Sequence, residues 1–184
     1  MGGEYQMKKV WILTLFPEYF EAFCSMGVIG RAIARKHVDV RILNIRDFSE
    51  GKHKSVDAYP YGGGAGMVMR IDVLSKALKE GAGYTRPTHH LVCASPRGQV
   101  WSNTLASNFA HSNLEDLKKE LVFVCGRYEG IDERFFDLYV NQHYSLGDFV
   151  LSGGEFAIMS FLDSSLRFVP GVLGNQDSCV EESF

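Results

Sequence analysis

Glycine and carboxylate residues meet apolar segments twice between Leu121 and Gly154. The run Leu-Val-Phe-Val-Cys (121–125) leads into Gly-Arg-Tyr-Glu-Gly-Ile-Asp-Glu-Arg (126–134), and Ser-Leu-Gly-Asp-Phe-Val-Leu-Ser-Gly-Gly-Glu (145–155) closes the stretch. An apolar run bounded by glycine is typical of a buried strand, and open α/β sheets hold their ligands just past the ends of such strands. The stretch is therefore a candidate ligand site.

A third segment with the same character, Ser-Pro-Arg-Gly (95–98), follows the apolar run 89–94. Glycine lets the backbone approach a flat ligand closely, and exposed backbone N–H and C=O groups can pair with an adenine edge. The carboxylates could bind ribose hydroxyls or favour a cationic ligand. The residue types leave two interpretations open, a nucleotide-like ligand or ordinary tight turns.

Several motifs for other chemistry are absent from the sequence. It contains no G-x-G-x-x-G after a strand and no G-x-x-x-x-G-K-[ST], so neither a dinucleotide fingerprint nor a phosphate-binding P-loop is predicted. It also lacks H-E-x-x-H, a clustered Cys/His set and G-x-S-x-G. We therefore expect no metal ligands and no Ser/His/Asp hydrolase site.

The elements that must position these loops alternate along the chain. Apolar runs or apolar/polar alternation predict strands over 8–16, 37–45, 89–94, 121–125 and 144–146. Helical spacing and capping signals, with Asp72 and Ser102 as candidate N-caps, predict helices over about 18–24, 28–36, 72–80, 102–111, 132–140 and 154–168. This alternation predicts an α/β fold, a parallel sheet flanked by helices. Between Arg46 and Arg70 neither period holds, which predicts a long functional loop.

Composition favours one soluble globular domain, since 46% of the 184 residues are hydrophobic and 22% are charged. The sequence has no apolar run long enough to span a membrane and no signal peptide at its start. Its four cysteines, Cys24, Cys93, Cys125 and Cys179, are scattered without a C-x-x-C pair. We expect reduced thiols and a cytoplasmic protein.

The net charge of -3 hides an asymmetry. Residues 1–99 contain 14 Lys and Arg against 9 Asp and Glu, whereas residues 100–184 contain 5 against 13. The basic residues between Arg31 and Lys54 are a candidate surface for a phosphate backbone, although scattered charge on a solvated surface explains them as well.

Four segments of the sequence together resemble one known family. They are Tyr61–Met67, Leu121–Arg134, Gly147–Glu155 and Arg167–Gly174, and they occur in the family's order. They closely resemble the TrmD family of bacterial tRNA (guanine-N1)-methyltransferases, in the SPOUT class. The resemblance runs from about Val10 to the last residue.

The resemblance implies a domain organisation. Residues 1–170 would form the SPOUT catalytic domain, whose C-terminal half folds into a deep trefoil knot over roughly 89–168, a rare exception to the rule that chains do not thread loops. Residues 171–184 would begin an interdomain linker, and the family's small tRNA-binding C-terminal domain would be absent from this chain. The family works as a homodimer with active sites at the subunit interface and acts on tRNA, so we expect no membrane partner.

The resemblance also implies a cofactor, S-adenosylmethionine, which becomes S-adenosylhomocysteine. Phe149 replaces the family's common Tyr, and Ala65 replaces a common Pro. By position in the motifs, the cofactor-binding residues are Cys93, Ala94, Ser95, Pro96, Gly126, Tyr128, Glu129, Leu146, Gly147, Phe149, Leu151, Gly153 and Gly154.

The implied reaction is methylation of ring N1 of the guanosine just 3′ of the tRNA anticodon, position 37. That nitrogen carries a proton at neutral pH, so a base must accept it. The family uses an Asp, and the matching residue is Glu182, with Glu181 as a neighbouring candidate. Arg167 would face guanine O6, where negative charge develops. Family activity also depends on Mg²⁺, for which the sequence offers no ligand cage.

Structural and functional alternatives accompany these assignments. Arg167 could be an ion-paired residue at a helix end, and Arg127, Asp132, Glu133 and Arg134 could form a structural ion-pair network. The chain could also be a SPOUT methyltransferase for another RNA position, or a non-catalytic module that binds RNA or the cofactor.

Overall fold

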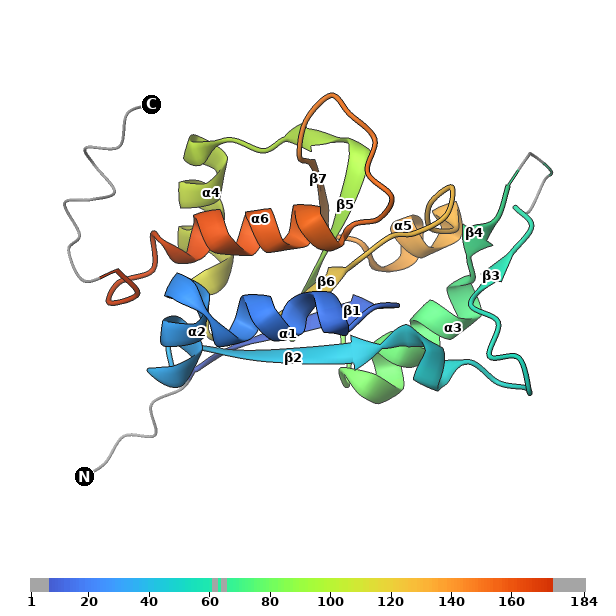
Figure 1. Ribbon diagram of the computed structural model, residues 1–184, viewed down its shortest axis with the longest axis horizontal. Coiled ribbons are helices and arrows are strands. Elements are labelled where there is room, and N and C mark those ends of the chain that lie inside the picture. The colour runs from blue at the N-terminus through green and yellow to red at the C-terminus, as the bar shows by residue number, and fades with distance from the viewer. Residues whose placement is uncertain (1–6, 61–62, 64–65, 174–184) are drawn as a thin grey trace.

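Five parallel strands form the central sheet of the computed structural model (Figure 1), which describes residues 7–60, 63 and 66–173. Every pairing between neighbouring strands of this sheet is parallel, as the alternation of elements predicted. Across the sheet the strand order is β2 (Val38–Asn44), β1 (Lys8–Thr14), β6 (Glu120–Val124), β5 (His89–Val100) and β7 (Gln142–Ser145).

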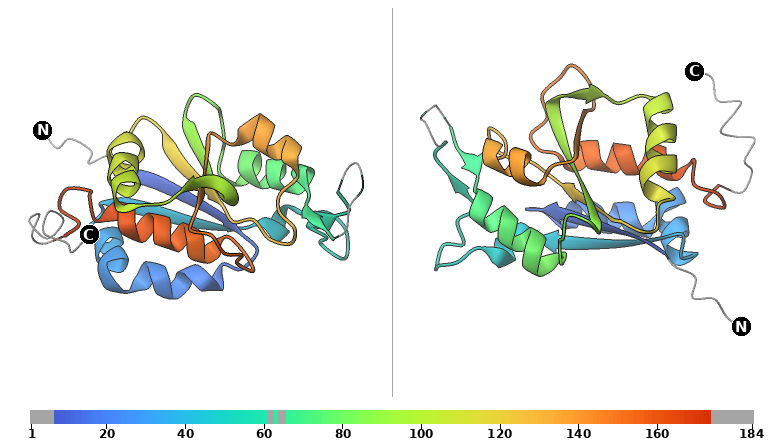
Figure 2. Two further views of the ribbon diagram at one scale, coloured as in Figure 1. Left: turned by 90° about the horizontal axis from the view of Figure 1, so that it is seen from above. Right: turned by 180° about the vertical axis from the view of Figure 1, so that it is seen from behind.

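Helices cover both faces of the sheet (Figures 1 and 2). One face packs against α1 (Glu18–Ser25), α2 (Gly27–Ala34), α4 (Asn103–Phe109) and α6 (Glu155–Leu166), and the other against α3 (Ile71–Lys76) and α5 (Glu133–Tyr139). In β6, Leu121 and Phe123 join the first core while Val122 and Val124 join the second. The central strand is therefore buried on both faces, which explains its continuous apolar run.

Two π-helical turns and one 3-10 turn accompany these helices and strands. The π-helical turns η2 (Ala77–Gly81) and η3 (Ala110–Leu114) extend α3 and α4, and the 3-10 turn η1 (Ile45–Phe48) follows β2. Ser102 caps α4 as predicted, because its hydroxyl accepts a hydrogen bond from the Leu105 N–H at 3.2 Å. Within the described ranges no helix is long and apolar enough to cross a membrane.

Strand β5 does not end at Ala94, and that prediction was wrong. The strand continues to Val100, and its register with β7 shifts between Ala94 and Gln99. The backbone of β7 comes so close that a Cβ on Gly98 would lie 2.6 Å from the Tyr144 Cα. Ser95–Gly98 are therefore a bulge inside a strand rather than a connecting loop.

The sequence predicted a loop throughout the stretch between Arg46 and Arg70, but part of this stretch is regular. It contains a two-residue antiparallel pair, β3 (Asp57–Ala58) with β4 (Val68–Met69). The pair is held by a long-range contact, since the Met69 N–H donates to the Gly130 carbonyl at 2.9 Å. Asp72 is not an N-cap either: α3 begins at Ile71, and the Asp72 carboxylate lies 2.6 Å from the Arg70 guanidinium.

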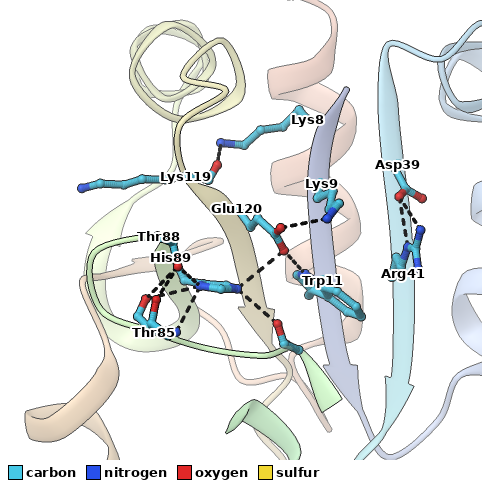
Figure 3. A network of polar contacts seen from close by, with 11 residues as sticks. Lys8, Lys9, Trp11, Asp39, Arg41, Thr85, Thr88, His89, Lys119 and Glu120 are labelled. Carbon is cyan, nitrogen blue, oxygen red and sulfur yellow. Dashed lines mark hydrogen bonds and ion pairs between the residues drawn. The ribbon is translucent and has the colours of Figure 1, made fainter. Parts of the chain in front are cut away.

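The amino end of the sheet is closed by polar side chains (Figure 3). The Glu120 carboxylate accepts hydrogen bonds from Trp11 Nε1 at 2.6 Å and from Lys9 Nζ at 3.0 Å, and it lies 3.5 Å from Nε2 of the buried His89. The buried Lys8 ammonium donates to the carbonyls of Asp116 and Lys119. Each of these polar groups has a partner from another segment, so this end of the sheet is a structural seal.

Candidate active site

A cleft of about 310 Å³ opens at the opposite, carboxyl end of the sheet. Its walls are the bulge in β5, the loop after β6 and the loop between β7 and α6, which are the three segments that the sequence singled out. Twelve of the thirteen residues expected to bind a cofactor line it: Ala94, Ser95, Pro96, Gly126, Tyr128, Glu129, Leu146, Gly147, Phe149, Leu151, Gly153 and Gly154. The structure therefore brings residues from three distant segments to one place.

Cys93 is the thirteenth residue, and its side chain does not line the cleft. It is fully buried in the core beside β6. Burial raises the pKa of this thiol well above its usual range, and it does the same for the buried Cys125 beneath the cleft. Neither sulfur is therefore a thiolate nucleophile at neutral pH, and the three described cysteines are free thiols.

Close backbone contacts hold the walls of the cleft together. The Gly154 N–H donates to the Gly126 carbonyl at 2.8 Å, which joins the start of α6 to the end of β6. A Cβ on Gly154 would lie 3.0 Å from both the Cys125 Cα and the Gly126 nitrogen. Glycine is needed here because two backbones meet without space for a side chain.

The Tyr128–Glu129 segment is fixed from the β3–β4 side. The Glu129 N–H donates to the Met67 carbonyl at 2.9 Å, and the Glu129 side chain lies against the bare backbone of Gly66, whose φ is +88°. Tyr128 has a φ of 60°, a left-handed conformation uncommon for a residue with a side chain. Tyr128 is 46% exposed and lines the cleft, so it is accessible to a ligand there.

A second cleft, of about 420 Å³, adjoins the first. Both are lined by Ala94, Ser95, Pro96, Gly126, Glu129 and Gly130, so only these residues separate them. The remaining lining combines four charged residues, Arg97, Asp132, Glu133 and Arg134, with Pro60, Val68, Ile131 and Phe136. A ligand in the first cleft and another in the second would lie on either side of these six residues, one of which carries the Glu129 carboxylate.

In the described part of the chain, the ion pairs of the charged residues after β6 are separate rather than joined in the one network considered from sequence. Arg134 pairs with Asp132 at 2.6 Å, whereas Glu133 pairs with Arg97 at 2.7 Å. Arg127 turns the other way and lies 2.9 Å from the Glu155 carboxylate. Burial alone would lower the pKa of Arg127, but the nearby Glu155 carboxylate raises it above the usual value.

Glu155 and Thr14 are site residues that the sequence reasoning missed. Glu155 is fully buried at the first position of α6, and its Oε1 accepts a hydrogen bond from the Thr14 hydroxyl at 2.9 Å. The pattern Gly-Gly-Glu marked a helix start, but nothing in it showed that the carboxylate points inward. Its partners come from the ends of β1 and β6, which only the fold brings near.

Arg167 lies away from both clefts within one chain. It is the C-cap of α6, whose first residue stands beside the cofactor cleft. Twelve residues of helix separate these ends, which is about 18 Å. Arg167 lines a separate hollow of about 150 Å³ with His111 and Phe168. Glu182 and Glu181 lie outside the described residues.

No group of three or more His, Cys, Asp or Glu side chains suited to a metal ion occurs in the described part of the chain. The site is instead a glycine-rich cleft, walled by backbone and apolar side chains, at the carboxyl edge of a parallel sheet. These features are those of an α/β protein with a ligand cleft at the carboxyl ends of its strands, the class that includes the SPOUT methyltransferases.

Comparison with known proteins narrows this class to one family. The model of the tRNA (guanine-1)-methyltransferase family TrmD matches residues 7–184, so the chain belongs to that family. Proteins named tRNA (guanine-N(1)-)-methyltransferase from Geobacter metallireducens and Clostridium tetani are each 44% identical to it, over 94% and 96% of the chain and 68% and 70% of their own lengths.

A solved structure supports the same assignment. The crystal structure of tRNA (m1G37) methyltransferase from Aquifex aeolicus superposes with a TM-score of 0.76 at 31% identity, covering 91% of this chain and 72% of that one. The chain is thus a transferase of the SPOUT class. The trefoil knot expected within 89–168 and the domain boundaries at 170 and 171 remain predictions.

Proposed function

We propose that this chain transfers a methyl group from S-adenosylmethionine to N1 of the guanine at tRNA position 37, in the cytoplasm. The observation that carries the proposal is the convergence of three glycine-containing segments on one cleft, beside a second cleft that shares their wall. One cleft would hold the methyl donor, and the other would admit the acceptor base. The family and its relatives support the type of reaction.

The residues of the first cleft fit S-adenosylmethionine. A volume of about 310 Å³ suits a ligand of this size, and apolar side chains such as Leu146, Leu151 and Ala157 can cover an adenine ring. Backbone groups at Gly126 and Gly147 can approach a ligand because no side chain intervenes. When bound, the cofactor supplies an electrophilic methyl group on a sulfonium sulfur.

The acceptor requires a base and a group that stabilises negative charge. Guanine N1 must lose its proton as it attacks the methyl group, and we assign that proton to the Glu182 carboxylate. The negative charge that then develops on O6 would be stabilised by the Arg167 guanidinium. Mg²⁺, on which activity in the family depends, could bind with few protein ligands because it retains water.

The position of Arg167 supports a homodimer. One chain holds its cleft and its Arg167 at opposite ends of α6, so the two cannot meet on one substrate within that chain. A second copy, related by a two-fold axis, could place its Arg167 at the first chain's cleft. Exposed apolar side chains beside the cleft, Phe149, Val150, Leu151 and Phe156, are 55%, 94%, 37% and 47% exposed and suit burial by that copy.

The decisive experiment measures methyl transfer from labelled S-adenosylmethionine to a tRNA transcript with guanosine at position 37, and to one with adenosine there. We expect transfer to the first alone, and its loss in Arg167→Ala and Glu182→Gln chains extended past Phe184. Transfer to both transcripts would indicate another RNA position. RNA or cofactor binding that persists without transfer in any chain would indicate a non-catalytic module.

Mixing two inactive variants tests the shared site. An Arg167→Ala chain is combined with a Gly153→Val chain, whose added side chain would meet Arg127 in the cleft wall. In a random mixture, half the dimers carry one copy of each, and one of their two sites is intact, so about a quarter of the wild-type activity returns. Absence of any recovery would show that Arg167 acts within its own chain or in structure alone.

A further inference from the structure

A buried ion pair joins the two loops that form the cleft. Arg127 belongs to the loop after β6, and one of its terminal nitrogens lies 2.9 Å from the Glu155 carboxylate at the start of α6. Its other terminal nitrogen donates to the Ser152 carbonyl at 3.1 Å. The Arg127 guanidinium thus contacts both the loop between β7 and α6 and the first residue of α6. Glu155 is also held by the Thr14 hydroxyl.

The surroundings of Arg127 fix its position. The guanidinium lies over the Phe16 ring, 4.5 Å from its centroid, and 5.7 Å from the Tyr19 centroid. It also lies against Gly153, where even a Cβ would overlap it. Arg127 is therefore confined between aromatic rings and a bare backbone, and a bulkier residue at position 153 would displace it.

This pair differs from the other ion pairs in the described residues. It is the only one of them in which both side chains are less than 15% exposed, at 14% for Arg127 and 0% for Glu155. A charge that is buried without its partner is strongly unfavourable, so each side chain restricts where the other can lie. Surface pairs exert no such restraint because water replaces the missing partner.

We propose that Arg127 and Glu155 are positioning residues that hold the two cleft loops at the separation required by the methyl donor. Arg127 lines the cleft, whereas Glu155 lies beneath it and cannot touch a ligand. Glu155 acts through Arg127 and the Ser152–Gly154 backbone. This inference rests on the proposed function, because the ligand whose affinity it controls is S-adenosylmethionine or its product.

Glu155→Gln is the sharpest variant, because it removes the charge and keeps the size of a residue outside the cleft. We expect it to weaken S-adenosylhomocysteine binding about tenfold or more in calorimetry, since the Arg127 guanidinium in the cleft wall loses the carboxylate with which it pairs. The KM for S-adenosylmethionine should rise in parallel, while the KM for tRNA changes less than about twofold. Unchanged affinity in this variant would overturn the proposal.

Two further variants show whether the pair acts as a unit. Arg127→Met should weaken binding to a similar extent, and Arg127→Met combined with Glu155→Gln should weaken it no more than the worse single change. Arg127→Lys keeps the charge near Glu155 but loses the planar fork that also reaches Ser152, so its affinity should fall between wild type and Arg127→Met. Fully additive losses would show that the two residues act separately.

Leu162→Ala is the control for general destabilisation. Leu162 is fully buried on the same helix, two turns beyond Glu155, and its truncation lowers the melting temperature without reaching the cleft. All affinities are measured well below the lowest melting temperature. If Leu162→Ala weakened binding as much as Glu155→Gln does, the pair would be merely structural. If the wild-type chain did not bind S-adenosylhomocysteine, the proposed function itself would fail.

Discussion

The two ends of one parallel sheet use polar residues in opposite ways. At the amino end, side chains fill the space: Glu120 contacts Trp11, Lys9 and His89 (Figure 3), and the Lys8 ammonium donates to the carbonyls of Asp116 and Lys119. At the carboxyl end, side chains are missing, and backbones meet directly at Gly154 and Gly126. Side chains close the amino end of the sheet, whereas the absence of side chains at glycine leaves the carboxyl end open.

The carboxylate ion pairs at the two ends also differ in their exposure to water. At the amino end the Glu120 side chain is 29% exposed, and its Lys9 partner is 48% exposed, so water can replace either of them. At the carboxyl end Glu155 is fully buried and Arg127 nearly so. Of these two ion pairs, the deeply buried one therefore lies beneath the cleft and not in the seal.

Truncating the two carboxylates should produce the largest difference between the ends. Glu155→Ala leaves the Arg127 guanidinium without its partner in a buried place and should cost about 3–5 kcal/mol of unfolding free energy. Glu120→Ala should cost about 1–2 kcal/mol, because hydrated groups take over its hydrogen bonds. Urea titrations at one fixed protein concentration measure both. Equal losses would contradict the distinction between a buried restraint and a solvated seal.

A methyl group added at the carboxyl end should have the next largest effect. Gly154 has a φ of −76°, so alanine fits the backbone conformation, but its Cβ would lie 3.0 Å from the Cys125 Cα. Gly154→Ala should therefore cost about 1–3 kcal/mol through overpacking. The matched control is Gly126→Ala, whose Cβ would meet only Ile131 side-chain atoms at 3.6 Å and should cost less than about 1 kcal/mol. Thermal unfolding of the two variants gives the comparison, and a reversed order would show that the helix start moves freely.

The sheet could be predicted because its signal is local and repeated. The run Leu121–Val124 is apolar throughout since its side chains alternate between two cores, and a single segment is enough to show this. The glycines of the cleft were also visible in the sequence, and twelve residues assigned from motif resemblance do line one cavity. The resemblance supplied the identity of the ligand, which the residue types alone left open.

What the sequence did not reveal depends on contacts between distant segments. The β3–β4 pair consists of two-residue strands that are held by the Gly130 carbonyl, too short to leave a periodic pattern. The bulge at Ser95–Gly98 depends on the backbone of β7. The burial of Glu155 depends on Arg127, 28 positions earlier in the sequence, and on Thr14 at the end of β1. The residues that surround each segment in the sequence do not show which distant segment it contacts.

The last predicted effect is a pH dependence of stability that arises from Lys8 at the amino end. Burial lowers the pKa of Lys8 from 10.5 to about 8, while the nearby Asp116 and Glu120 carboxylates oppose the change. Between these two values the unfolded chain holds the proton and the folded protein does not. Stability due to this group therefore rises with pH in that window, by at most about 1.4 kcal/mol per pH unit, and is lost as the pH falls through 8.

Lys8→Met isolates this contribution because the other titrating groups are common to both proteins. Its stability relative to wild type should be highest near about pH 7, where wild type pays for burying a charged ammonium, and should fall steadily towards about pH 10. The two carbonyls left without a donor lower the whole curve by a constant amount and leave its slope unchanged. Urea unfolding of both proteins at several pH values gives the difference directly. A difference in unfolding free energy that does not vary with pH would mean that the Asp116 and Lys119 carbonyls keep the Lys8 ammonium charged throughout. The amino end would then bury a charge, as the carboxyl end does.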